Sequence, residues 1–236
     1  MLDFNGARIL VIGGSSGIGQ AVAAIAHKAG AAVTIASRTP DRLQAAAAEI
    51  GADVSTQIVD ILDEASVQAL FDGPEYDHVV VTASAVRIAP VRELPLETAQ
   101  LAFDSKFWGF YRVARHARIK AGGSLGVVSG YLATRPVAGR ALMSAINASL
   151  EALTRGLALE LKPVRVNAVS PAMVKTPMWA GLNDSDREAL YARTAAGYPA
   201  GVIGQPGDVA TQLLLLASLP YATGTVVMLD GGASLV

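Results

Sequence analysis

The sequence of 236 residues contains no cysteine, only three histidines and few charged residues. Without cysteine the chain can form no disulfide, no thiolate nucleophile and no Cys-ligated zinc site. The histidines, His27, His78 and His116, lie far apart in the sequence, and their spacing predicts no metal site. Charged residues make up 17% of the chain, with 19 Lys and Arg against 20 Asp and Glu. This balance predicts that neither nucleic acid nor an anionic membrane is a partner.

Long apolar runs, repeats and low-complexity linkers are also missing. No stretch of about 18 apolar residues occurs, so the sequence predicts no membrane span. The N-terminal segment lacks the basic region, apolar stretch and small-residue cleavage site of a secretory signal. Hydrophobic residues form 52% of the chain, which excludes a disordered protein. We therefore expect a soluble cytoplasmic protein whose residues 1–236 form one domain.

Apolar runs rich in Val and Ile alternate with helix-like stretches along the whole chain. Their nearly continuous hydrophobicity is typical of parallel strands covered on both faces. Strands are predicted over Arg8–Ile12, Ala32–Ser37, Val54–Val59, His78–Thr82, Leu125–Ser129, Arg165–Val169 and Thr225–Leu229. Helices are predicted over Ile18–Ala29, Pro40–Ile50, Glu64–Phe71, Leu96–Lys120, Ala138–Leu161 and Gly207–Leu216. This order predicts an α/β fold with a doubly wound parallel sheet.

A glycine-rich turn joins the first predicted strand to the first helix. Glycine lets a backbone turn tightly and approach a pyrophosphate, and the helix N-terminus offers free N–H groups to the phosphates. The alternative is a plain structural turn, which the strand-turn-helix context disfavours. We therefore predict that the turn binds a dinucleotide through Gly13, Ser15, Ser16, Gly17, Ile18 and Gly19.

The residues after the second strand indicate which dinucleotide binds. An acidic residue there would bond the ribose hydroxyls and repel a 2′-phosphate, but the sequence has Ser37 and Arg38. Because Arg can bind a phosphate with two hydrogen bonds, we expect NADP(H) to be preferred over NAD(H). Alternatively, Arg38 is a solvated residue that opens the next helix. Asp60, after the third strand, either accepts the adenine amino group or caps the following helix.

These features together resemble the short-chain dehydrogenase/reductase family over essentially the whole chain. The resemblance also includes Val166–Pro171, Thr176-Pro177 and the ending Leu229–Gly232. It implies a seven-stranded Rossmann-type sheet and hydride exchange between a nicotinamide and a small carbonyl or alcohol substrate. It implies a homodimer or homotetramer built partly from the helices near 96–120 and 138–161, and a substrate lid over about 172–204. Further cofactor-binding positions implied by the resemblance are Ile61, Ala83, Ser84, Pro171, Val174 and Thr176.

The catalytic residues of the family are replaced in this sequence. Alignment places Met143 and Asn147 where the family has its Tyr-x-x-x-Lys pair. A thioether has no proton to transfer, and an amide carries no charge that could lower a phenol pKa. Lys106 stands at the position of the family's helical Asn, and Gly130 at that of its catalytic Ser, although a shift of one residue would restore Ser129.

Three hypotheses account for these replacements. The first is a reductase with a rebuilt site, in which Tyr131 transfers the proton, Lys106 supplies positive charge and Ser129 bonds the substrate oxygen. Structural roles are the alternatives: Tyr131 would pack a loop or subunit contact, and Lys106 would be a helix-surface or interface charge. The second hypothesis is an NADP(H)-binding sensor, scaffold or partner subunit without redox activity. In the third, substrate or ordered water supplies the proton.

The region expected to form the lid has its own composition. Met178, Trp179 and Tyr198 are candidates to line a mostly apolar substrate pocket. The charged residues within Gly181–Gly197 suggest a solvated, mobile cover.

Overall fold

A seven-stranded parallel sheet forms the centre of the computed structural model, which describes residues 2–236. The strand order is β3-β2-β1-β4-β5-β6-β7. From β1 the chain adds β2 and β3 on one side of the sheet and then crosses to add β4 on the other side. At this switch in strand order, a ligand crevice is expected at the carboxyl ends of β1 and β4. The doubly wound fold and its seven strands confirm the prediction. The strands are β1 (Arg8–Ile12), β2 (Ala32–Ser37), β3 (Ser55–Ile58), β4 (Tyr76–Val81), β5 (Ile119–Val128), β6 (Arg165–Pro171) and β7 (Val226–Leu229).

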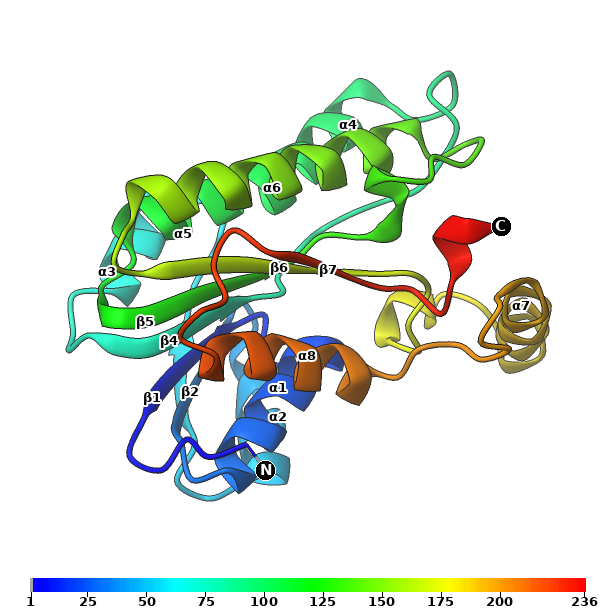
Figure 1. The fold of residues 1–236 in the computed structure, drawn as a ribbon. Helices are drawn as coiled ribbons and strands as arrows, with labels where there is room; N and C mark the ends of the chain where they lie inside the picture. Colours follow the sequence, from blue (N-terminus) through cyan, green and yellow to red (C-terminus); the bar gives the residue numbers. More distant parts are fainter. Residues whose placement is uncertain (1) are drawn as a thin grey trace.

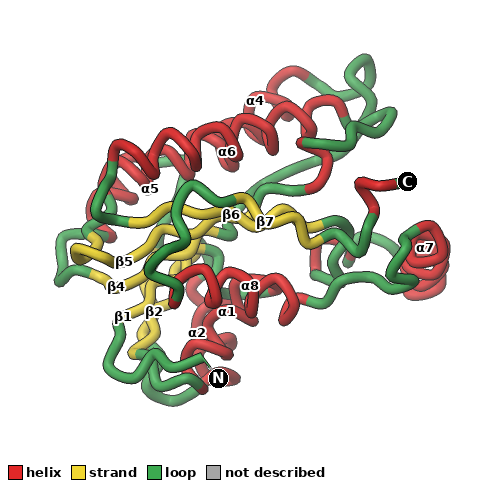
Figure 2. The backbone as a smooth tube through the Cα atoms, viewed as in Figure 1, coloured by secondary structure: helices red, strands yellow, loops and turns green. Residues whose placement is uncertain are grey.

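Helices cover both faces of the sheet (Figures 1 and 2). In Figure 1, α1, α2 and α8 lie below the sheet, α4, α5 and α6 lie above it, and α7 lies apart beside the C-terminus. A π-helical turn, Asp104–Trp108, joins α4 to α5. The helices are α1 (Gly17–Lys28), α2 (Pro40–Ile50), α3 (Glu64–Leu70), α4 (Leu96–Phe103), α5 (Gly109–His116), α6 (Ala141–Glu160), α7 (Asp184–Gly197) and α8 (Pro206–Ser218).

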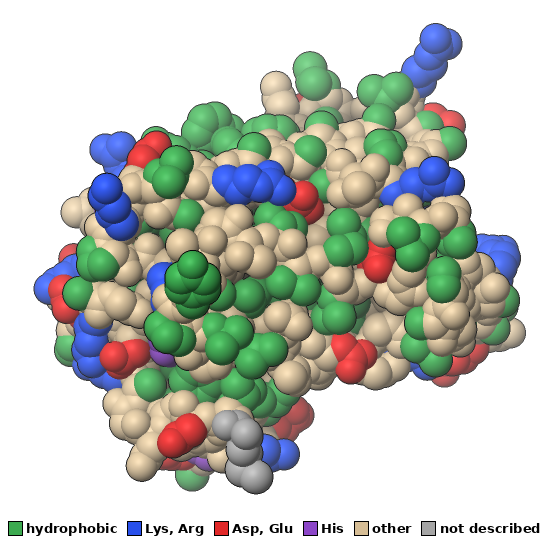
Figure 3. Space-filling model, viewed as in Figure 1, with side chains coloured by type: hydrophobic (Ala, Val, Ile, Leu, Met, Phe, Trp, Pro, Cys, Tyr) green, Lys and Arg blue, Asp and Glu red, His purple; other side chains and the backbone are tan. Residues whose placement is uncertain are grey.

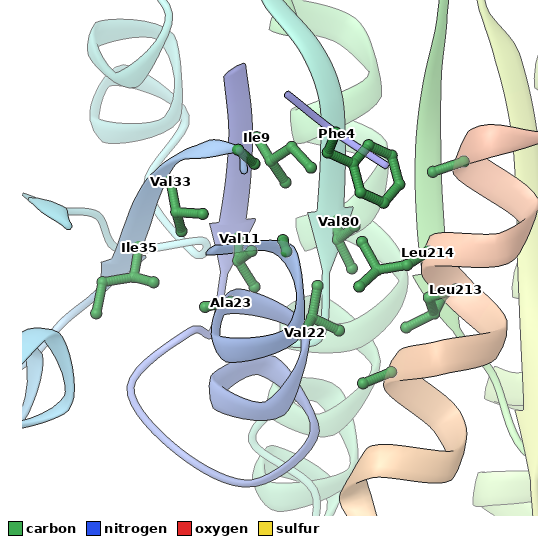
Figure 4. Packing of buried hydrophobic residues seen from close by; sticks show 14 of the residues in the cluster. Phe4, Ile9, Val11, Val22, Ala23, Val33, Ile35, Val80, Leu213 and Leu214 are labelled. Carbon is green, nitrogen blue, oxygen red and sulfur yellow. The ribbon is translucent and has the colours of Figure 1, made fainter. Parts of the chain in front are cut away.

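Each face of the sheet has its own hydrophobic core. Figure 4 shows part of the first core, where Val11 of β1 and Val80 of β4 lie near Val22 of α1 and Leu214 of α8. The second core joins the opposite face of the strands to α3, α5 and α6, with Phe110 fully buried. Burial of the strands on both faces explains why their sequences are continuously apolar instead of alternating.

The predicted helix Leu96–Lys120 is helical from Leu96 to His116, with the π turn inside it, and is wrong in its end. Helix α5 ends at His116 because Ala117 leaves the helical conformation, with ψ of 124°. Lys120 belongs to β5, which begins at Ile119 rather than at the predicted Leu125. A register shift between β4 and β5 lies in this early part of the strand, where the sequence is rich in glycine and lacks the apolar pattern.

Two further segments differ from the prediction by more than two residues. Helix α6 begins at Ala141 instead of Ala138, because Gly139 has a positive φ of 76° and ends the preceding loop. The segment read as a solvated cover contains the helix α7. Its N-cap is Asn183, whose side chain accepts a hydrogen bond from the backbone N–H of Asp186 at 2.9 Å. Its acidic residues are therefore part of a helix-start signal rather than of a loop.

The surface carries no dominant charge in the view of Figure 3, where acidic and basic side chains are scattered in small groups of both signs. Within residues 2–236, no helix combines the length and the apolar character that crossing a membrane requires. The same residues contain no group of three or more His, Cys, Asp or Glu side chains arranged to hold a metal ion.

Candidate cofactor cleft and active site

The glycine turn between β1 and α1 is packed too closely for side chains at Gly13, Gly14 and Gly19. Gly13 has φ of 89°, and a Cβ there would lie 2.6 Å from both the backbone nitrogen of Ala83 and Oγ1 of Thr82. A Cβ at Gly19 would collide with the carbonyl group of Gly13. Thr82 at the end of β4 donates to the carbonyl oxygens of Ile12 and Gly13 at 3.2 and 3.3 Å. The turn is therefore locked against β4, with α1 beginning at Gly17.

The N-terminus of α1 opens into a cleft of about 650 Å³ along the carboxyl ends of β1, β2 and β4. Ser16 is the N-cap, but its side chain makes no capping hydrogen bond, and the first turn contains no acidic residue. The free N–H groups and the positive end of the helix dipole are thus left for an anion. No Asp or Glu lines the cleft, whereas Arg38, Arg42 and Arg87 do.

One end of the cleft carries an unpaired polar group between arginines. The hydroxyl of Ser37 is the one fully buried side-chain oxygen or nitrogen in residues 2–236 that has no hydrogen-bond partner. Arg38 and Arg42 line the cleft beside it, and neither guanidinium has an ion-pair partner within the same residues. A buried polar group without a partner costs free energy, so this hydroxyl fits a bound polar ligand. The two guanidinium groups and the hydroxyl are hydrogen-bond donors that fit a bound phosphate group.

Most of the predicted cofactor residues lie in this cleft. Those that line it are Gly13, Ser15, Ser16, Gly17, Ile18, Gly19, Ser37, Arg38, Ile61, Ala83, Ser84 and Thr176. The lining residues do not include Asp60, Pro171 or Val174. Arg42 was missed by the sequence analysis, although its place in the first turn of α2, close to Arg38 in the sequence, is a usable signal.

Asp60 makes a local turn, and of the two interactions predicted for it the structure excludes the helix cap. Its Oδ1 accepts from the backbone N–H of Leu62 at 3.1 Å. The capping alternative is wrong, because Asp63 is the N-cap of α3 and accepts from the backbone N–H of Ala65 at 3.0 Å. Val174 lines a separate cavity of about 390 Å³ beside α8, and Pro171 is buried at the end of β6.

The π turn directs two polar side chains inward from the same place. Ser105 is buried, and its hydroxyl accepts from the backbone N–H of Ala85 at 3.0 Å. Lys106, which is half-buried, donates from Nζ to the carbonyl oxygen of Ser129 at 2.9 Å and to Oδ1 of Asn147 at 2.7 Å. Lys106 is thus not the helix-surface charge that was the structural alternative. Such π turns recur at functional sites in other proteins.

A buried carboxylate lies one helical turn beyond Asn147. Oε1 of Glu151 accepts hydrogen bonds from the hydroxyls of Ser129 at 3.0 Å and Ser170 at 2.9 Å. These contacts fasten the ends of β5 and β6 to α6. The sequence analysis missed Glu151, whose signal is its i, i+4 spacing from Asn147 on one helix face.

Burial of the ammonium lowers the pKa of Lys106 from 10.5 to about 8, and the negative charge of Glu151 partly opposes this shift.

The three candidate catalytic residues do not form one cluster. Ser129 contacts Lys106 through its carbonyl group, while its hydroxyl is engaged by Glu151. Tyr131 lies in a 3-10 turn and lines a separate cavity of about 400 Å³ with Tyr198 of the lid region and Arg135. Of the other lid candidates, Met178 lines the cofactor cleft, and Nε1 of Trp179 donates to the carbonyl of Val174 at 3.1 Å. Met143, four residues before Asn147 on α6, is buried.

Comparison with known proteins agrees with this geometry. The family model described as enoyl-(acyl carrier protein) reductase matches residues 12–234. A short-chain dehydrogenase/reductase of Stachybotrys chlorohalonatus is 34% identical, with 100% of both chains covered. The crystal structure of a small-chain dehydrogenase in complex with NADPH has a TM-score of 0.85 at 35% identity, covering 98% of this chain and 100% of that one. The NADPH-bound structure of a short-chain oxidoreductase from Pseudomonas aeruginosa, described as containing an atypical catalytic centre, has a TM-score of 0.91 at 28% identity, covering 98% of each chain.

Proposed function

The chain belongs to the short-chain dehydrogenase/reductase family of oxidoreductases, and from this premise we propose that it is an NADP(H)-dependent enzyme that reduces a small carbonyl compound. The observation that carries the cofactor assignment is the cleft at the end of β2, which contains the unpaired hydroxyl of Ser37, Arg38 and Arg42 and no carboxylate. The NADPH-bound neighbours support the same cofactor. When bound, the nicotinamide exchanges a hydride with the substrate.

We propose a non-standard site for the chemistry around that hydride exchange. Met143 and Asn147 occupy the positions where the family pattern has Tyr and Lys. The positive charge near the end of β5 comes instead from Lys106, held by the carbonyl of Ser129. Tyr131, two residues beyond Ser129, is the candidate proton donor, because a phenol can give a proton to a carbonyl oxygen as the hydride arrives. Ser129 serves chiefly through its backbone, since its hydroxyl is bound by Glu151.

The test begins with calorimetry of NADPH and NADH binding to the purified protein. NADPH oxidation is then followed with a panel of ketones, aldehydes, quinones and enones. The proposal expects tight NADPH binding and turnover with at least one carbonyl compound. Turnover without a preference for NADPH would contradict the cofactor assignment, and stereospecific hydride transfer would establish the enzyme class.

A second candidate function is a nucleotide-binding protein without redox activity. The observation in its favour is that Tyr131 lines a different cavity from the cofactor cleft, so no described phenol lines that cleft. Tight NADPH binding with no turnover across the whole panel would establish this alternative.

We further propose a homodimer or homotetramer in the cytoplasm, with contacts through the helices α4, α5 and α6. This face exposes apolar side chains, among them Leu101, Trp108, Tyr111 and Leu159. When another copy of the chain covers these side chains, apolar surface is removed from water, and this stabilises the assembly. Light scattering of the wild type and of Trp108→Glu measures the assembly, and a monomeric wild type would refute it.

A further inference from the structure

The side-chain amide of Asn147 is held in a single orientation. Its Oδ1 accepts from the ammonium of Lys106 at 2.7 Å. An ammonium carries only donors, so the atom that faces Lys106 must be the amide oxygen and not the nitrogen. While Lys106 is protonated, this contact fixes which atom of the amide is oxygen and which is nitrogen. Nδ2, with its two protons, points away from Lys106.

The amide nitrogen faces Gly130 and has no partner. A Cβ added at Gly130 would lie 2.6 Å from Nδ2 of Asn147. Gly130 has φ of 163°, an extended conformation open to any residue, so it is the amide and not the backbone that requires glycine there. No described residue accepts a hydrogen bond from Nδ2, and Asn147 as a whole is only 2% exposed. Nδ2 is therefore a nearly buried donor beside the end of β5, and a nearly buried donor without a partner fits a bound polar atom.

The sheet register places this donor at the ligand edge. Val81 of β4 pairs with Val127 of β5, so Ser129 and Gly130 follow β5 beside the residues that follow β4. Of these, Ala83 and Ser84 line the cofactor cleft. On the other side of β5, the backbone N–H of Ser129 donates to the carbonyl oxygen of Val169 on β6 at 2.9 Å. The amide thus lies at the carboxyl edge of the sheet, one strand beyond the end of the cleft.

We propose that Nδ2 of Asn147 donates the hydrogen bond that holds the substrate carbonyl oxygen and stabilises the negative charge that forms on it. Lys106 acts through Asn147 as a positioning residue that also polarises the amide. This inference rests on the proposed reductase function. An amide whose oxygen binds a cation is a stronger donor at its nitrogen, because hydrogen bonds in a chain polarise one another. A fixed donor aimed at developing negative charge is the arrangement of an oxyanion hole.

Reduction of the substrate carbonyl needs only the groups already named. The carbonyl carbon gains a hydride with its electron pair from the reduced cofactor, which becomes oxidised. The π-electron pair of the carbonyl moves to oxygen, where the N–H of Asn147 stabilises the alkoxide. The oxygen then takes a proton from Tyr131 or from water. Because Asn147 gives up no proton, the arrangement works without an ionisable group at its position.

The first test needs no substrate. In the NADPH-bound, ¹⁵N-labelled protein, the side-chain NH₂ signal of Asn147 is assigned by its loss in Asn147→Asp and followed from pH 6 to 10. We expect it to titrate with a midpoint near 8, where Lys106 ionises, and to stop titrating in that range in Lys106→Met. The charged group that acts on Lys106 across this range is Glu151. A signal that does not move, or that moves equally in Lys106→Met, would overturn the coupling.

The second test separates substrate from cofactor. Asn147→Asp is nearly isosteric and can pair with Lys106, but it removes the donor. With the carbonyl compound found in the NADPH-oxidation screen, we expect kcat to fall about 100- to 1000-fold, as for loss of one oxyanion-hole donor. NADPH affinity should change less than about 3-fold, and the control Ser149→Ala, whose hydroxyl bonds only within α6, should match the wild type in both assays.

The outcomes of the second test distinguish the inference from the proposed function. A tenfold or larger loss of NADPH affinity in Asn147→Asp would mean that the amide binds the cofactor instead. An unchanged kcat would also overturn the proposal. If no compound is turned over by the wild type, the proposed function fails, and the role assigned to the amide nitrogen fails with it, whereas the titration still decides the coupling to Lys106.

Discussion

Replacement of Arg38 by alanine tests the cofactor assignment most directly. Arg38 lines the cleft beside the unpaired hydroxyl of Ser37, and no acidic side chain lines that cleft to compete for the guanidinium. A hydrogen bond to a charged group contributes roughly 1.5–3 kcal/mol. At 1.4 kcal/mol for each factor of ten, its loss weakens NADPH binding by about 10- to 150-fold. NADH lacks the 2′-phosphate, so its affinity should change little.

The assay is calorimetry of both cofactors at fixed ionic strength, since salt screens an exposed guanidinium. Arg42→Ala should weaken NADPH binding in the same direction, and the double variant should lose most of the preference. Arg155→Ala, on the exposed surface of α6, is the matched control and should bind like the wild type. If Arg38→Ala and Arg42→Ala left the ratio of NADPH to NADH affinity unchanged, the assignment of this end of the cleft would be refuted.

Four further predictions concern the turn, the site and the fold. Gly19→Ala places a methyl group against the backbone of Gly13 and should abolish NADPH binding in calorimetry. Its far-ultraviolet circular dichroism spectrum should remain that of the folded protein. Tyr131→Phe should reduce kcat by roughly 100-fold or more if its phenol gives the proton, and full activity would exclude that role. The fold lowers the pKa of Lys106 to about 8, so between pH 8 and 10.5 the unfolded chain binds more protons than the folded one. The unfolding free energy of the wild type minus that of Lys106→Met should therefore rise over this range, and a difference that does not change with pH would contradict this. Arg165→Met removes a buried guanidinium that donates to three carbonyl oxygens at the end of α8. The unfolding free energy measured with urea should fall by about 3 kcal/mol or more, and an unchanged value would mean that water replaces the guanidinium.

Local patterns predicted the fold because they report on single elements. Outside β5, the predicted strands match the observed ones to within two residues at each end. Prediction failed where a tertiary contact competes with local preference. The π turn lies inside a helix whose sequence gives no sign of it, and it directs Ser105 and Lys106 inward toward partners from β5, α6 and the loop after β4. The early part of β5 pairs with β4 despite its glycines.

The candidate site divides in the same way. The phosphate-binding turn is continuous in sequence, so its glycines and the following helix could be recognised together. The contacts of Glu151 and the orientation of Asn147 could not, because each depends on residues that are distant in the chain or on another element. Arg42 lies close to Arg38 in the sequence and could have been predicted. Tyr131 is close to Ser129 in the sequence, but the fold directs it to a separate cavity and not to Lys106.

The sequence by itself determined the α/β class, the dinucleotide turn and the absence of cysteine chemistry, since composition and short-range periodicity carry that information. It also led to the prediction that a thioether and an amide, Met143 and Asn147, stand where the family pattern has a phenol and an ammonium. Only the tertiary structure decided that Lys106 reaches across from the π turn to Asn147, and that Glu151 ties β5 and β6 to α6. The physical reason is that hydrogen bonds and buried charges depend on distances in space, and these are fixed by packing between elements rather than by the order of residues.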